Sequence, residues 1–268
     1  MMSLWDALRM NMMISYQELV RTFPKEDQML NAILEGKAGR ITLNEGIPQS
    51  WRTVFQSYED LLTAAIWSRI NYLSPSAMDH FFSALLGINR GSWGEFESIT
   101  FWPKYAFPKK VEDEMKLNLS GQERFAEPDL VITFEHTALI VEVKPPAGGM
   151  QYQQQWRKEL YTYLHDDDAK TAVHFLALGN LPTAAQDWFS ELKTEFPQVD
   201  FHGMEWRRLR EIFQHSEWEA PQDKRIVADC LKALTLYGIR APLLPWQRFH
   251  QYLAETPLPS EYSFLKEQ

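Results

Sequence analysis

Helical spacing of apolar residues dominates both ends of the chain. Apolar side chains that recur every three or four positions fall on one face of a helix, and they are the main sign of a helix packed on a core. Ser50 stands just before the longest such segment, where its hydroxyl can accept a hydrogen bond from a free amide of the first turn. The helices predicted in this way cover residues 16–23, 26–34, 51–73, 78–86, 152–164, 184–196, 205–213 and 224–237.

In the middle of the chain the spacing changes to that of strands. Residues 126–134 and 138–143 are rich in β-branched side chains and only three residues separate them, so we expect a hairpin. The continuous apolar run over 171–178 is typical of a strand buried on both faces. Further strands are predicted over 96–107 and 199–202. Strands that alternate with helices in this order predict an α/β fold, with a mixed central β-sheet flanked by helices.

The domain organisation follows from the same pattern, which no linker interrupts. Residues 51–210 are expected to form one core. Residues 1–50 would form an N-terminal helical extension, and residues 211–268 a C-terminal helical extension packed on the core.

Three charged residues lie in or beside the two strands of the predicted hairpin. Glu142 and Lys144 are two positions apart, so their side chains leave the same face of the strand. Asp129 opens the neighbouring strand, where pairing can bring its carboxylate beside Glu142. Mg²⁺ prefers carboxylate, water and phosphate oxygens, and a lysine beside it can orient a water or stabilise charge on a phosphate. The set indicates metal-dependent phosphodiester hydrolysis, and the alternative is a turn aspartate beside a solvated Glu142–Lys144 pair.

Pro128-Asp129 followed by Glu142-Val143-Lys144 resembles the signature of the PD-(D/E)XK nuclease superfamily, which has the restriction-endonuclease-like fold. The order of helices and strands over residues 51–210 is similar as well. The resemblance implies that Asp129 and Glu142 bind Mg²⁺, with Mn²⁺ as a substitute. It also implies that Lys144 positions or activates the attacking water.

The same family usually places one more acid on the first core helix, where this chain has Glu59 and Asp60. Glu59 lies on the apolar stripe of the predicted helix and Asp60 lies on another face, so Glu59 is the expected third metal ligand. The alternative is that Glu59 is a first-turn acid favoured by the helix dipole. Glu45, in a Gly-flanked loop, is a further option.

Several glutamines follow the Lys144 motif on the next predicted helix, and Gln154 or Gln155 is expected to support the site. One branch of the superfamily, similar to the RecB nuclease domain, has a glutamine followed four residues later by tyrosine. This chain departs from that pattern, because Glu159 stands four residues after Gln155. An exposed polar helix face is the alternative. Farther along, the basic residues of 206–210 could grip phosphates or form a salt-bridged surface.

Composition limits the class of protein. The 268 residues include 27 Lys and Arg against 36 Asp and Glu, a net charge of −9, which argues against a protein that coats nucleic acid. A single cysteine, Cys230, excludes a disulfide framework and a cysteine-based zinc module. No apolar run approaches the ~20 residues of a membrane helix, and the N-terminus lacks the layout of a signal peptide. We therefore expect a cytoplasmic protein that does not enter a membrane.

The expected function is that of a Mg²⁺-dependent endonuclease acting on DNA rather than RNA. The resemblance further implies an effector of an anti-phage or restriction-type system. The acidic surface and the lack of a recognition domain favour targeting by a partner subunit, and two cuts on a duplex would need a homodimer. The alternatives are a nuclease-fold subunit that cuts nothing and docks a partner protein, and a metal-dependent hydrolase of another phosphoester.

Overall fold

The computed structural model describes residues 32–33, 35–42, 48–108 and 124–240. The predicted helix over 16–23, most of the one over 26–34, and Glu45 lie outside these residues. Within them, no helix combines the length and the apolar character needed to cross a bilayer.

A five-stranded sheet forms the centre of the molecule, and its strands run in the order β3-β6-β7-β8-β9. β6 pairs antiparallel with both β3 and β7, so the predicted hairpin of β6 and β7 is confirmed. β8 and β9 continue the sheet in parallel with β7, which makes it mixed as expected. The strands are Phe96–Phe101, Leu130–Phe134, Thr137–Val143, Ala172–Leu178 and Val199–Met204.

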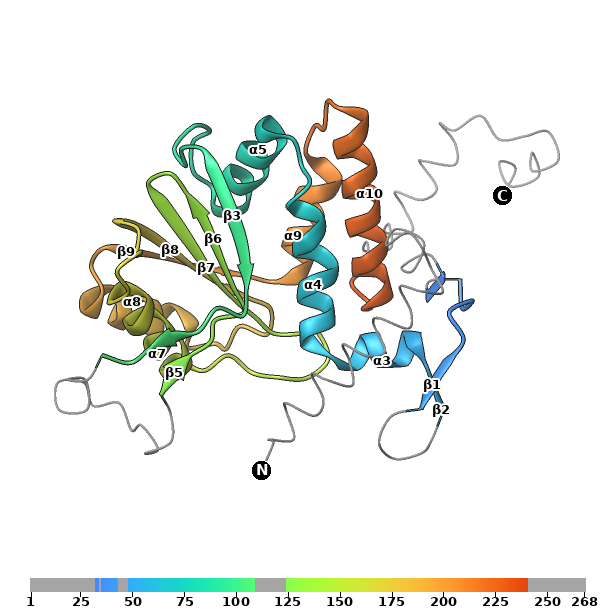
Figure 1. The fold of residues 1–268 in the computed structure, drawn as a ribbon, viewed down its shortest axis with the longest axis horizontal. Helices are drawn as coiled ribbons and strands as arrows, with labels where there is room; N and C mark the ends of the chain where they lie inside the picture. Colours follow the sequence, from blue (N-terminus) through green and yellow to red (C-terminus); the bar gives the residue numbers. More distant parts are fainter. Residues whose placement is uncertain (1–31, 34, 43–47, 109–123, 241–268) are drawn as a thin grey trace, which may run out of the picture.

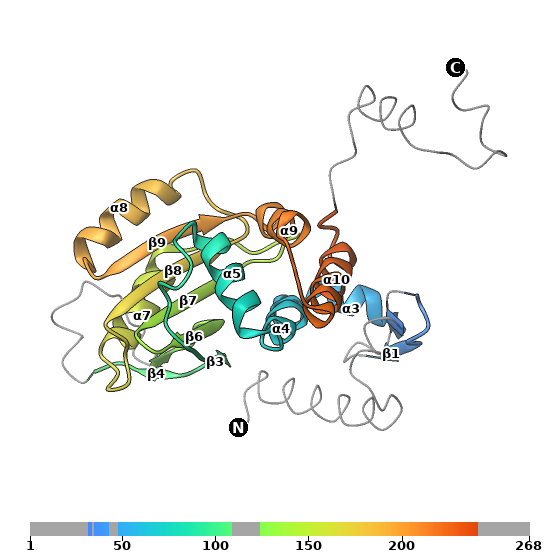
Figure 2. The same cartoon turned by 90° about the horizontal axis from the view of Figure 1, so that it is seen from above.

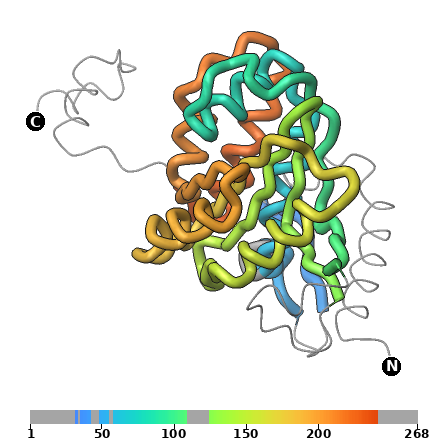
Figure 3. The backbone as a smooth tube through the Cα atoms, turned by 90° about the vertical axis from the view of Figure 1, so that its left-hand side faces the viewer, coloured from blue at the N-terminus to red at the C-terminus, as the bar shows by residue number. Residues whose placement is uncertain are grey.

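Helices cover both faces of this sheet (Figures 1 and 2). The side chains of each strand alternate between the faces, so each face has a hydrophobic core of its own. Against one face lie α7 (Gln153–Leu164) and α8 (Ala185–Glu195). Against the other lie α4 (Glu59–Ile70), α5 (Pro75–Leu86) and α9 (Trp206–His215), and α10 (Pro221–Leu236) packs on α4 and α9. α10 packs along α4, and Figure 3 shows α5 and α10 at the same end of the molecule.

The helix predicted over 51–73 is in fact two helices, α3 (Trp51–Ser57) and α4. Tyr58 separates them because its backbone is extended, with φ −115° and ψ 121°. The prediction for Ser50 is confirmed, since its Oγ accepts a hydrogen bond from the Thr53 amide at 3.1 Å. The break has a consequence for the site, because it makes Glu59 the first residue of a new helix.

Two predicted strands are also interrupted. The one expected over 96–107 ends at Phe101, because Trp102 has a positive φ of 48° and Pro103 follows it. The one expected over 126–134 is divided by Pro128, which cannot donate to a strand ladder. The detached pieces, β4 (Tyr105–Ala106) and β5 (Phe125–Ala126), pair with each other. Asp129 is thereby left between two strands, at the entrance to β6.

A short hairpin precedes α3, in the expected N-terminal helical extension, where the sequence predicted no strand. β1 (Arg40–Thr42) and β2 (Pro48–Ser50) pair antiparallel, so part of the expected N-terminal helical extension is extended. Strands of three residues are too short to show a reliable alternation of apolar and polar side chains. The remaining helices and strands differ from the prediction only at their ends.

Candidate metal-binding active site

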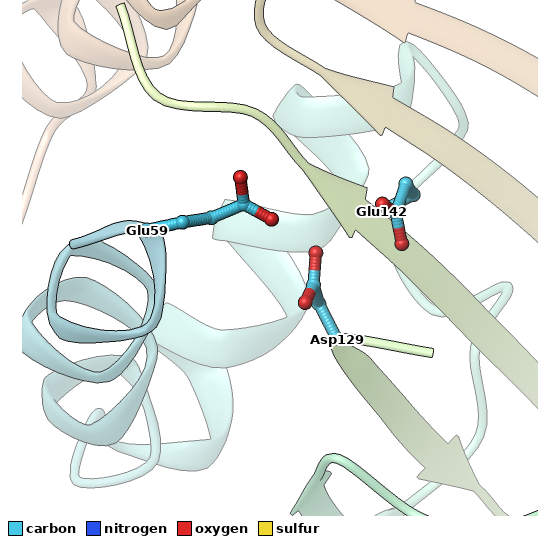
Figure 4. Close-up of side chains that lie close together, drawn as sticks. All are labelled: Glu59, Asp129 and Glu142. Atoms are coloured by element: carbon cyan, nitrogen blue, oxygen red, sulfur yellow. The ribbon is translucent and has the colours of Figure 1, made fainter. Parts of the chain in front are cut away.

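Three carboxylates from three different parts of the chain meet at one end of β7. Asp129 precedes β6, Glu142 lies within β7, and Glu59 opens α4 (Figure 4). Each offers a carboxylate oxygen, and these oxygens all lie within 4.8 Å of one another. The expected convergence of Asp129 and Glu142 is confirmed, and Glu59 joins them. Because Glu59 is also the first residue of its helix, the helix dipole and the site both favour a carboxylate at this position.

Asp129 is fixed by the strand beside it. Its Oδ2 accepts a hydrogen bond of 2.7 Å from the backbone amide of Val143. The residue is only 8% exposed, and burial together with the charge of Glu142 raises the pKa of its carboxyl well above the usual value. Asp129 is therefore not the solvated turn residue of the alternative interpretation.

Lys144 is the counter-ion of this cluster. Its Nζ lies 2.5 Å from Oε1 of Glu142 and 2.9 Å from Oε1 of Glu59, and it also donates to the carbonyl of Val143 at 3.0 Å. Burial disfavours the charged ammonium, but the surrounding carboxylates outweigh that effect, and the pKa of Lys144 is raised above its ordinary value. The side chain is therefore a cation at neutral pH.

The backbone of Lys144 is held as firmly as its side chain. Its amide donates to Leu178 O at 2.8 Å, and its carbonyl accepts from Nε1 of Trp206 at 2.7 Å. The turn at Gly179 makes this approach possible. Gly179 has a φ of 84°, and a Cβ there would lie 2.3 Å from Lys144 O. Only glycine fits at this position.

Behind Glu142 lies a residue that sequence reasoning missed as part of the site, Glu159 of α7. Gln155, one turn earlier on the same helix, donates to Oε1 of Glu142 at 2.6 Å. Glu159 is 2% exposed, and its carboxyl lies beside the side chains of Gln155 and Glu142. Burial, followed by the charge of Asp129, raises the pKa of Glu159 to about 8, and burial, followed by Glu159, raises that of Glu142.

The charges in this cluster do not balance. Four carboxyl groups, those of Glu59, Asp129, Glu142 and Glu159, face the single ammonium of Lys144. Among the described residues, Oε2 of Glu142 and Oε2 of Glu159 are buried without a hydrogen-bond partner. Buried carboxylates without partners are costly unless they take up a proton or a cation. An oxygen-rich cluster with this excess of negative charge fits a hard divalent cation such as Mg²⁺ or Mn²⁺.

The segment after Lys144 is anchored over the cluster. Nδ2 of the Asn180 side chain donates to the carbonyls of Pro145, Gly148 and Gly149, at 2.7, 2.8 and 3.1 Å. Gln151 is buried and donates to Gly179 O at 3.1 Å. The segment is thus a fixed wall of the site.

Other candidates from the sequence lie elsewhere. Of the two glutamines, Gln155 reaches Glu142, whereas Gln154 is on the exposed surface of α7. Asp60 is not among the three converging carboxylates. Of the basic residues in 206–210, Arg207 and Arg208 pair with Glu211 at the surface, which agrees with the salt-bridged alternative.

Comparison with known proteins adds a distant relative. The chain is 26% identical over 231 residues to a protein of Pasteurella multocida (strain Pm70) described as "Uncharacterized protein PM0110". The alignment covers 81% of this chain and 83% of that protein. No family model matches the chain, and no solved structure matches it. What the site can do therefore follows from its own geometry.

Proposed function

We propose that this chain is a divalent-cation-dependent nuclease that hydrolyses phosphodiester bonds of DNA. The observation that carries the proposal is the meeting of Glu59, Asp129 and Glu142 around the ammonium of Lys144. Metal-assisted phosphodiester hydrolysis needs oxygen ligands for a cation and a positive group for the phosphate, and this cluster supplies both. The resemblance of the same residues to the PD-(D/E)XK signature supports the proposal independently of the geometry.

Each residue has a role in this proposal. Glu59, Asp129 and Glu142 hold the cation, which when bound polarises the scissile phosphate and lowers the pKa of a water. Lys144 keeps its proton, so it acts as a hydrogen-bond donor that orients the attacking water and stabilises charge on the phosphate oxygens. Gln155 and Glu159 are positioning residues that fix Glu142 from behind.

The net charge of −9 bears on how such a nuclease reaches its substrate. Non-specific binding to duplex DNA depends on many Lys and Arg contacts to phosphates. With acids in excess over the whole chain, a partner subunit that supplies targeting and a basic surface fits this protein.

The test is cleavage of supercoiled plasmid, linear duplex, single-stranded DNA and RNA in the presence of Mg²⁺ or Mn²⁺. Wild type is compared with Asp129→Ala, Lys144→Ala and a matched control, Asp187→Ala, which removes an exposed aspartate from α8. We expect cutting that needs the metal, that Asp129→Ala and Lys144→Ala abolish, and that Asp187→Ala leaves unchanged.

Two results would overturn the proposal. Cutting that persists in Asp129→Ala or in the presence of a chelator would place the activity elsewhere, in the protein or in a contaminant. A wild-type protein that cuts nothing, and that shows no Mn²⁺ binding by calorimetry, would favour the alternative of a nuclease-fold subunit that docks a partner protein.

A further inference from the structure

Large apolar side chains that face solvent are rare in the described part of the chain, and most of them adjoin the site. Monomeric proteins usually expose such side chains singly, and their gathering in one place marks a binding surface. Four of the five lie next to segments that carry the cluster. The five are Tyr58, Tyr72, Phe125, Met150 and Tyr152.

Three segments that adjoin the cluster along the chain carry these four side chains. Tyr58 immediately precedes Glu59, and Phe125 lies on β5, just before the turn that ends at Asp129. Met150 and Tyr152 belong to the segment between β7 and α7. Figure 1 shows the start of α4, β5 and this segment along the same lower edge of the molecule. Together, Tyr58, Phe125, Met150 and Tyr152 are called the rim.

The segment that carries Met150 and Tyr152 lies directly over the cluster. A Cβ placed on Gly149 would be 3.1 Å from Cδ of Lys144 and 3.6 Å from Oε2 of Glu59. Met150 is 61% exposed and Tyr152 is 53% exposed, so both face solvent within a few residues of this contact. This part of the rim therefore stands beside the atoms that would meet a phosphate.

A lysine lies against the exposed ring of Phe125. Nζ of Lys104 lies 5.0 Å from the centroid of the Phe125 ring, and it pairs with Glu127 at 3.3 Å. An exposed ring with a lysine against it offers a base a stacking surface and a phosphate a positive charge.

We infer that the rim binds unpaired nucleotides of single-stranded DNA by base stacking and leads their backbone into the cluster, an inference that rests on the proposed nuclease function. Only unpaired bases expose their faces to aromatic side chains, whereas a duplex presents mainly phosphates. A protein of net charge −9 has little positive charge for a duplex, but stacking does not depend on charge. The substrate class that fits is thus single-stranded DNA, or the unpaired end of a duplex.

The charges at the centre of the rim argue against a protein partner there. An apolar docking face would have to cover the carboxylates of the cluster and remove water from Glu59, whose side chain is 27% exposed, which is costly for a charged group. A nucleic acid brings phosphates that share a cation with those carboxylates.

The experiment measures binding of fluorescent oligonucleotides by anisotropy in Ca²⁺, and their cleavage in Mg²⁺. The substrates are an oligothymidylate, a duplex of the same length, and the corresponding RNA strand. The variants are Phe125→Ala, Tyr152→Ala and the conservative Tyr152→Phe. Tyr72→Ala is the matched control, because Tyr72 is 61% exposed but lies beyond the opposite end of α4.

We expect wild type to bind the single strand about tenfold or more tightly than the duplex. Each rim alanine should weaken that binding about 5- to 100-fold, whereas Tyr152→Phe and Tyr72→Ala should leave it unchanged. All variants should bind Mn²⁺ as wild type does, which would separate the rim from the metal site. Tighter binding of the RNA strand would overturn the assignment to DNA.

The inference fails if the rim variants bind and cut single strands as wild type does, or if they lose binding to a protein partner instead. Neither result would affect metal-dependent cutting that Asp129→Ala abolishes. The proposed function itself fails if wild type cuts no substrate. That result would also overturn the inference about the rim.

Discussion

Buried carboxylates lie near both ends of helix α4, and their surroundings differ. At its start, Glu59 joins Asp129 and Glu142 around the ammonium of Lys144. Beyond its other end, Asp223 of α10 accepts hydrogen bonds from the amide and the hydroxyl of Ser74, at 2.9 and 2.7 Å. Asp223 is 2% exposed, so both ends contain carboxylates removed from solvent.

The difference lies in how fully each group is satisfied. Both oxygens of Asp223 have donors, and the Ser74–Asp223 hydrogen bonds join α10 to the start of α5. This structural role accounts for the burial of Asp223. The cluster at the other end has more carboxyl groups than donors, and two of its buried oxygens lack a partner. Burial of an acid is thus a weak sign of function, whereas burial without partners is a strong one.

The largest expected effect comes from removing the ammonium group of Lys144 at the Glu59 end of α4. Lys144→Met leaves Glu142 and Glu59 without their ammonium, so the metal-free protein should lose about 3 kcal/mol of unfolding free energy. Mn²⁺ should restore more stability to this variant than to wild type, as measured by urea unfolding. Lys232→Met, which breaks an exposed pair with Asp229, should change little. Equal losses in the two variants would contradict the distinction between the ends.

A second effect should be visible as a dependence on pH. The pKa of Glu159 is about 8 in the folded protein, against 4.5 for an ordinary glutamate, so the folded state binds more protons. The unfolding free energy of the metal-free protein should therefore fall as pH rises from about 4.5 to about 8. Glu159→Gln removes this loss, and at about pH 9 it should be more stable than wild type by about 3 kcal/mol. Denaturation curves of equal pH slope for both proteins would refute the assignment.

At the other end of α4, where Asp223 bonds to Ser74, the expected effect is on stability alone. Asp223→Ala leaves the amide and the hydroxyl of Ser74 without acceptors, which should cost about 2 kcal/mol of unfolding free energy. The cost should be the same with and without Mn²⁺, and cleavage per folded molecule should not change. A weaker affinity for Mn²⁺ in this variant would show that the two ends of α4 are coupled.

The smallest effect separates two adjacent glutamines. Gln155→Ala removes the 2.6 Å hydrogen bond to Glu142 and should weaken Mn²⁺ binding about tenfold. Gln154→Ala changes an exposed neighbour on the same helix and serves as the matched control. Calorimetry that gives equal affinities for the two variants would remove Gln155 from the site.

Much of the site could be predicted from the sequence because strand geometry is regular. The spacing of Glu142 and Lys144 fixes their common face, and the hairpin brings Asp129 beside them. Glu159 could have been found by the reasoning that selected Glu59. It lies three residues after Trp156 and four before Tyr163, on the buried face of α7. The glutamine–tyrosine pattern of the resembled family has no acid at this position, so that pattern gave no signal for Glu159.

The breaks in the chain were harder to predict for a physical reason. Tyr58 is neither proline nor glycine, so nothing local marks the extended backbone that divides α3 from α4. That conformation is therefore set by contacts beyond the local sequence. Trp102 and Pro128 carried a signal, since proline restricts the residue before it and interrupts strand ladders. The alternation of side chains on both sides concealed that signal.

The turn at Gly179 predicts a sequence signature that homologous chains should share. Lys144 follows β7, Gly179 follows β8, and Trp206 opens α9. Gly179 packs against the hydrogen bond between the Lys144 carbonyl and Nε1 of Trp206. A Cβ at residue 179 would meet both the backbone carbonyl of Lys144 and Nε1 of Trp206, so a substitution of Gly179 would displace the hydrogen bond between them. Residue 144 contributes only its backbone oxygen here, so this contact constrains the glycine and the tryptophan and not the lysine. A distant homologue built in this way should therefore carry the glycine and the tryptophan, in that order. This spaced pair is more informative about common ancestry than the short acidic motif, which chance produces often.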